Sequence, residues 1–153
     1  MLLAFGLSSL VFGILHLGNP NATWVSVINI CLAGLFLGLG MVLTGSLAIP
    51  IGLHITWNLF QGNVFGFAVS GIRIGATVIA TETVANTWLV GGAFGPESGF
   101  VSILAMLLGS VLTVLWVRWK QPLRLMTDLA KYEPRIRHEG HQPQKSEPVQ
   151  DVV

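Results

Sequence analysis

Long apolar runs separated by short polar or glycine-containing breaks dominate the first 119 residues of the chain. A membrane-spanning helix needs about 20 mostly apolar residues, and the runs that predict such helices, the third of them short, are 1–17, 25–45, 47–61 and 99–119. The breaks fall at residues 19–21 (NPN), at 44–46 (TGS) and at Pro96, where proline and glycine favour turns. The pattern predicts an all-α, polytopic membrane helix bundle with about four to five membrane helices.

Residues 62–98 interrupt this pattern, because glycines are scattered through an apolar background. We expect a loop with one or two short helices there. Irregular backbone at membrane depth is tolerated only where protein or a wet cavity covers it, so this segment indicates a polar interior. Within 25–45, Gly34, Gly38 and Gly45 recur at near-helical spacing, and such small residues let neighbouring helices approach closely.

Charged residues are almost absent from the apolar part of the chain. Residues 1–117 hold only Arg73, Glu82 and Glu97. Charged residues make up 10% of the whole chain and hydrophobic residues 52%, whereas about a quarter of a soluble domain is charged. We therefore expect a lipid bilayer around residues 1–119 and a polar, largely disordered tail at 120–153, whose last part, 142–153, is rich in Gln, Glu, Ser and Pro.

The charge distribution also bears on topology and partners. The net charge of +1, with no basic and aromatic binding module, argues against a nucleic-acid partner. Cys31 is a single cysteine, which offers neither a disulfide nor a cysteine-based metal site. The start of the chain lacks the basic segment and cleavage site of a signal peptide. A multi-pass cell-membrane protein with a cytoplasmic C-terminus is predicted, since six basic residues lie near or beyond the end of the last apolar run, namely Arg118, Lys120, Arg124, Lys131, Arg135 and Arg137.

Three polar side chains inside the charge-free region are the candidates for chemistry. His16 ends the first run, and His54 and Asn58 lie four residues apart in the third, on one face of a helix. Ionisable groups in membrane segments usually mark functional sites. Two imidazoles could hold a divalent ion or orient water, and an amide could stabilise an oxyanion. The alternative is that these residues only form hydrogen bonds between helices, and the spacing alone leaves both interpretations open.

Two stretches of sequence resemble motifs of the CPBP intramembrane endopeptidases, the family that includes CAAX prenyl proteases. Residues 8–16, SSLVFGILH, are similar to the second motif of the family, and residues 44–58, TGSLAIPIGLHITWN, are similar to the third, HxxxN. Flanking stretches agree as well, namely QGNVFG at 61–66, VSG at 69–71 and GGAFGPE at 91–97. The resemblance covers roughly residues 8–100, in the expected order and at the expected separations.

This resemblance implies an endopeptidase that hydrolyses a membrane-proximal peptide bond in a peptide or prenylated-protein substrate. By resemblance, His16, His54 and Asn58 are the catalytic residues, and His16 and His54 hold a divalent metal ion, with zinc the candidate. The family's first motif, EExxxR, supplies the water-activating glutamates and is absent from the sequence. We therefore expect residues 1–119 to be an N-terminally incomplete protease domain that is inactive alone, with the missing motif encoded upstream of Met1.

Glu82 and Glu97 are weak candidates to replace the missing base, and Arg73 resembles an interfacial anchor. Glu97 follows Gly95-Pro96, which favours a charge at a helix N-terminus or a role in a turn.

Two other function classes stay open. One is a non-catalytic membrane scaffold or regulator with the same fold, and the other is a small membrane transporter. A transporter should show a continuous polar stripe, whereas residues 99–119 offer only Ser102, Ser110 and Thr113.

Overall fold

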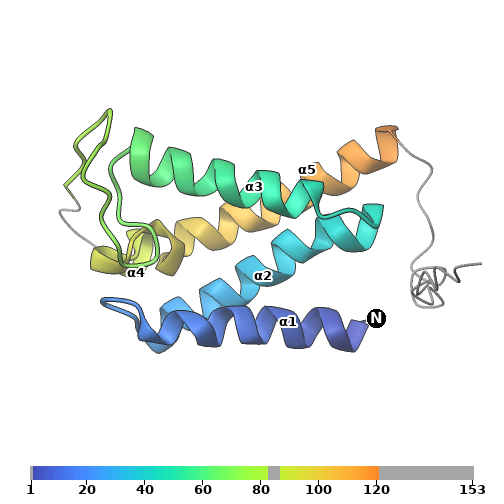
Figure 1. Cartoon of the computed structure of the whole chain (residues 1–153), viewed down its shortest axis with the longest axis horizontal. Coiled ribbons are helices and arrows are strands. Elements are labelled where there is room, and N and C mark those ends of the chain that lie inside the picture. Colours follow the sequence, from blue (N-terminus) through green and yellow to red (C-terminus); the bar gives the residue numbers. More distant parts are fainter. Residues whose placement is uncertain (1, 83–86, 121–153) are drawn as a thin grey trace, which may run out of the picture.

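The computed structural model describes residues 2–82 and 87–120, and within these residues the chain is helical. Apart from one isolated β-bridge between Val69 and Ile72, no strand pairing occurs in this part of the chain. The four longer helices run alternately in opposite directions, with α2 crossing the middle of the bundle (Figure 1). They are α1 (Leu2–Leu15), α2 (Trp24–Thr44), α3 (Ala48–Asn58) and α5 (Phe100–Lys120). The prediction of an all-α fold is confirmed.

These four helices coincide with the four predicted apolar runs. A 3-10 turn, His16–Gly18, extends α1, and a π-helical turn, Leu59–Val64, extends α3. The helices α2 and α5 contain 21 residues each, which gives a length of about 32 Å at 1.5 Å per residue. Both are long and apolar enough to cross a membrane, whereas α1 with its 3-10 turn is a shorter apolar helix. The four to five predicted membrane crossings stay a prediction.

Local sequence explains where α2 begins and ends. The chain turns at Asn21, whose φ is 59°, and the helix then starts with a capping box in which Thr23 and Ser26 exchange side-chain and backbone hydrogen bonds. Its C-terminus is closed by Gly45, whose φ of 70° suits glycine. The breaks predicted at 19–21 and 44–46 are therefore confirmed.

The helices α1 and α2 pack closely because small residues lie between them. A Cβ atom on Gly34 would be 2.9 Å from the Cα of Ser9, and one on Gly13 would be 2.9 Å from the carbonyl oxygen of Val27. Gly38 lies beneath the ring of Phe5. The predicted role of Gly34 and Gly38 in helix packing is confirmed. Gly45 has a different role, since it ends α2 and nothing lies within 4 Å of an added Cβ.

The segment between α3 and α5 forms the predicted loop with short helical turns, gathered at one end of the bundle (Figure 1). Besides the π-helical turn, it contains α4 (Thr87–Val90) and two 3-10 turns, Gly92–Phe94 and Pro96–Ser98. Hydrogen bonds from Gly71 N to Phe94 O and from Asn19 Nδ2 to Ser70 O connect it internally and to the end of α1. These contacts place residues far apart in sequence beside one another.

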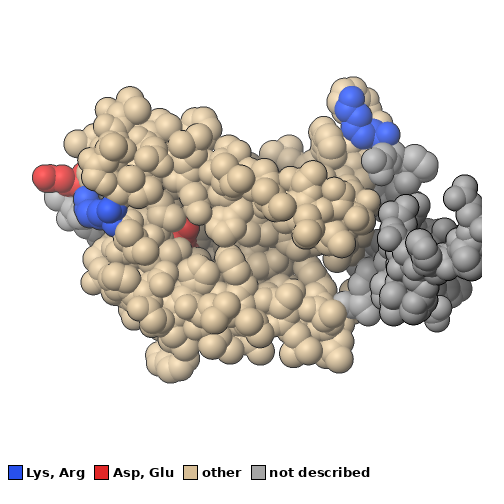
Figure 2. Space-filling view, in the orientation of Figure 1, with Lys and Arg blue, Asp and Glu red and all other residues tan. Residues whose placement is uncertain are grey.

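Charged atoms in the described residues gather at the two ends of the bundle, with one acidic side chain in a hollow between them (Figure 2). Arg73 and Glu82 are exposed in the loop, and Arg118 and Lys120 are exposed at the end of α5. Between these ends, α5 presents an apolar outer face that includes Leu104, Leu108, Leu112 and Leu115. The exposed aliphatic residues suit contact with lipid.

We expect the C-terminus to be cytoplasmic, because moving the basic residues after α5 across a bilayer opposes the positive-inside bias. A reporter fused after Val153 measures the location of the C-terminus. Residues 121–153, which make up almost all of the tail predicted to be disordered, lie outside the described part of the chain. The start of α1 lies at the same end of the bundle as the end of α5 (Figure 1). Labelling of an added tail cysteine by an impermeant reagent in intact cells, in a Cys31→Ser background, would contradict the prediction.

Candidate active site

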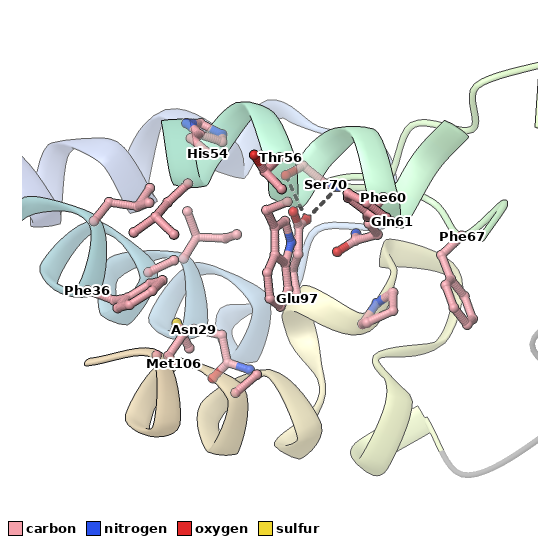
Figure 3. A pocket seen from close by; sticks show the side chains of 18 of the residues that line it. Asn29, Phe36, His54, Thr56, Phe60, Gln61, Phe67, Ser70, Glu97 and Met106 are labelled. Carbon is pink, nitrogen blue, oxygen red and sulfur yellow. Dashed lines mark hydrogen bonds between the residues drawn. The ribbon is translucent and has the colours of Figure 1, made fainter. Parts of the chain in front are cut away.

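An apolar cavity of about 490 Å³ lies between the helices and the loop end of the bundle. All four longer helices contribute to its wall, and so do the π-helical turn and the loop (Figure 3). This volume is within the range of small-molecule pockets, which are mostly apolar with a few placed polar groups. The polar or ionisable residues in the wall are His16, Asn29, His54, Thr56, Gln61, Ser70 and Glu97.

His16 lies where α1 passes into its 3-10 turn, and its ring is oriented by the preceding helical turn. Its Nδ1 is 2.6 Å from the carbonyl oxygen of Phe12. Since a carbonyl oxygen can only accept, Nδ1 is the donor, and in the neutral imidazole Nε2 keeps its lone pair. The same arrangement is common for histidines that bind metals. His16 is thus prepared to accept a hydrogen bond or bind a cation through Nε2.

His54 projects from the middle of α3 into the same cavity. The Phe12 ring lies edge-on to both imidazoles, with ring centroids 4.8 Å from His16 and 5.7 Å from His54. The two histidines therefore come together although one belongs to the end of α1 and the other to α3. Phe12 packs against both imidazole rings and also lines the cavity.

Asn58 lies one helical turn after His54, at the end of α3. It is not among the residues of the cavity wall, and its Oδ1 is buried with no hydrogen-bond partner in the described residues. The structure brings His16 and His54 together in one cavity but leaves Asn58 outside its wall. The catalytic roles of the three residues stay predictions.

Glu97 is a residue of the cavity wall that sequence reasoning had placed in a turn or at a helix N-terminus. It does occupy the 3-10 turn Pro96–Ser98 just before α5, yet its side chain is only 8% exposed and lines the cavity. Its Oε2 accepts hydrogen bonds from the N–H of Ser70 at 2.6 Å and from the Ser70 hydroxyl at 2.8 Å. Glu82, in contrast, is exposed.

Gln61 is a further residue of the site, named from the sequence only as the first residue of the stretch 61–66. It lies in the π-helical turn, a distortion that is frequent at functional sites, and its side chain is 6% exposed. Its Nε2 donates to the carbonyl oxygen of Ala68 at 2.6 Å, while Oε1 is buried without a hydrogen-bond partner in the described residues. The sequence signal that could have identified it is a glutamine in an apolar stretch directly before the glycine-containing segment 62–98.

The divalent metal that the family resemblance implies needs more ligands than these two histidines. Catalytic zinc typically has three protein ligands. The described residues hold no group of three His, Cys, Asp or Glu side chains close enough to share an ion. His16 and His54 are thus the available pair, and they do not complete a zinc site by themselves. The metal stays a prediction.

The family profile described as type II CAAX prenyl endopeptidase Rce1-like matches residues 1–60. No curated protein and no solved structure matches the chain. The matched segment contains α1, α2 and α3, and with them His16, His54 and Asn58.

Proposed function

Because the chain belongs to the CPBP family through residues 1–60, we propose that it acts as an intramembrane endopeptidase of the CAAX-protease type. The reaction is hydrolysis of a membrane-proximal peptide bond by a water molecule. One observation carries the proposal. His16 and His54, from different helices of the segment that matches the family, line the same apolar cavity and contact the same phenylalanine.

The two imidazoles orient the attacking water. His16 offers Nε2 as an acceptor, because its Nδ1 donates to Phe12. His54 makes no side-chain hydrogen bond within the described residues, so both of its ring nitrogens are available to water or substrate. The surrounding wall, which includes Leu53, Trp57 and Phe60, is apolar, and a bound substrate that displaces water from it would strengthen these polar interactions.

The same wall supports a hydrophobic substrate. Aromatic and aliphatic side chains from every long helix face the cavity, and among them are Phe12, Ile30, Phe36, Trp57, Phe60 and Phe65. A peptide with a prenyl group, or an apolar peptide within the bilayer, would bury its surface against these residues. The cavity therefore suits the peptide or prenylated-protein substrates of a CAAX-type protease.

The test is cleavage of a quenched fluorescent, farnesylated CAAX peptide by protein reconstituted in lipid vesicles. Residues 1–153 and, where the DNA upstream of Met1 is open in frame, the extended chain are each expressed, and mass spectrometry identifies the bond that is cleaved. Hydrolysis that depends on His16 and His54 supports the proposal. A correctly inserted protein that leaves the peptide intact would instead indicate a non-catalytic scaffold or regulator.

Asn58→Ala should lower kcat about 100- to 1,000-fold, the usual cost of removing one oxyanion donor. The Asn58 side chain makes no hydrogen bond within the described residues, and its Oδ1 is buried. Asn58 lies outside the cavity wall in the structure, so the oxyanion role requires its side chain to turn toward the bound substrate, and no side-chain hydrogen bond opposes that turn. Steady-state kinetics in vesicles separates kcat from KM. The control is Asn63→Ala, which removes an amide whose Nδ2 already donates to the carbonyl oxygen of Ala76 in the loop. A change in KM alone would contradict the oxyanion role.

A further inference from the structure

The cavity contains a carboxylate to which the proposed function assigns no role. Glu97 is largely buried in the wall, and no lysine or arginine lines the cavity. A buried charge is costly unless it is paired and hydrogen-bonded. Glu97, His16 and His54 line the same cavity, but the described residues hold no group of three such side chains close enough to share a metal ion.

Ser70 fixes the direction of this carboxylate. Both hydrogen bonds from Ser70 go to Oε2, and no hydrogen bond to Oε1 occurs within the described residues. Ser70 itself has a φ of 48°, a left-handed conformation, and its carbonyl accepts a hydrogen bond from Asn19 at 3.0 Å. Hydrogen bonds to Asn19 and to Glu97 therefore fix the loop at Ser70. Oε1 of Glu97 is left to bind another group.

Gln61 supplies a second acceptor at this end of the cavity. The hydrogen bond from its Nε2 to Ala68 sets the orientation of the amide, so that Oε1 is the atom left without a partner. In Figure 3 the oxygen of Gln61 points to the side on which Glu97 lies. The cavity wall thus contains two side-chain oxygens without a hydrogen-bond partner in the described residues, Oε1 of Glu97 and the buried Oε1 of Gln61, and no described cation.

We propose that Glu97 and Gln61 form a binding site for a primary ammonium group, such as the side chain of a substrate lysine. An ammonium has three donors and no acceptor, which matches two acceptor oxygens of which one belongs to a carboxylate. The aliphatic stem of a lysine can lie along apolar surface while its head stays in a polar site. The proposal rests on the proposed function for the nature of its ligand, a peptide.

The test measures binding rather than cleavage, so that a failed cleavage assay does not decide it. Lysine is moved through each position of a fluorescent apolar peptide, and each peptide is compared with its norleucine counterpart by fluorescence anisotropy in lipid nanodiscs. Hydrogen bonds to charged groups are among the stronger ones, so we expect lysine at one position to bind at least about 10-fold tighter than norleucine. Acetylation of that lysine should remove the preference.

Three variants locate the preference within the cavity. Glu97→Gln should abolish it without changing the affinity for the norleucine peptide, since the new amide oxygen can still accept from Ser70. Gln61→Met should reduce it about threefold to tenfold. Glu82→Gln, which alters an exposed carboxylate, should leave it unchanged. The proposal is overturned if no position prefers lysine in the unmodified protein, if the preference survives Glu97→Gln, or if Glu97→Gln weakens both peptides equally.

Discussion

His54→Ala should lower the rate of peptide cleavage at least about 100-fold, since a positioned proton-accepting group typically contributes 10²–10⁴ in rate. The imidazole lines the cavity from the middle of α3 and lies edge-on to Phe12. Its removal takes away one of the two groups that orient water. His16→Ala should have an effect of similar size. The measurement is the initial rate on the farnesylated peptide in vesicles.

The fold should tolerate His54→Ala, because this side chain makes no hydrogen bond within the described residues and is only half-buried. Helix content by circular dichroism and membrane insertion should match those of the unmodified protein. His138→Ala, which changes a histidine outside both motifs, is the control and should cleave normally. Loss of insertion in His54→Ala would favour the interpretation that this histidine only holds helices together.

Sequence alone could predict the helices because their limits are set locally. The predicted run 25–45 corresponds to the observed α2, Trp24–Thr44, because Thr23 and Ser26 cap the start of the helix and Gly45 ends it. The pairing of His16 with His54 was also expected, although only through the motifs of the family. Periodicity could not show it, because the two residues belong to different helices whose packing depends on contacts far along the chain.

The polar end of the cavity could not be predicted, for a physical reason. The contact between Ser70 and Glu97 joins two loop residues, and the one between Gln61 and Ala68 depends on a π-helical turn. Neither follows a helical or strand period. Sequence placed Glu97 correctly near the start of α5, but whether its side chain faces solvent or a cavity depends on how the loop folds back.

The packing of α1 on α2 gives the second large effect that we expect. Gly13→Leu should destabilise the protein by about 1–3 kcal/mol or more, the usual cost of overpacking. Gly13 is buried, and an added Cβ would collide with Sγ of Cys31 and lie 2.9 Å from the carbonyl oxygen of Val27. The collision with Sγ could be relieved by a side-chain rotation, but the one with the backbone requires α1 to move away from α2.

A matched control lies on the same helix, because Gly6 has nothing within 4 Å of an added Cβ. Gly6→Leu should leave stability unchanged or raise it by up to about 1 kcal/mol, since leucine is a better helix former than glycine. Thermal unfolding in detergent, followed by circular dichroism, measures both variants.

Cys31→Ala should rescue Gly13→Ala only in part, because the backbone atoms Val27 O and Cys31 N would remain 2.9 and 3.0 Å from the new Cβ. Equal unfolding temperatures for Gly13→Leu and Gly6→Leu would contradict the close approach of α1 and α2. Since this approach also sets the distance between His16 at the end of α1 and His54 on α3, Gly13→Leu should lose cleavage along with stability.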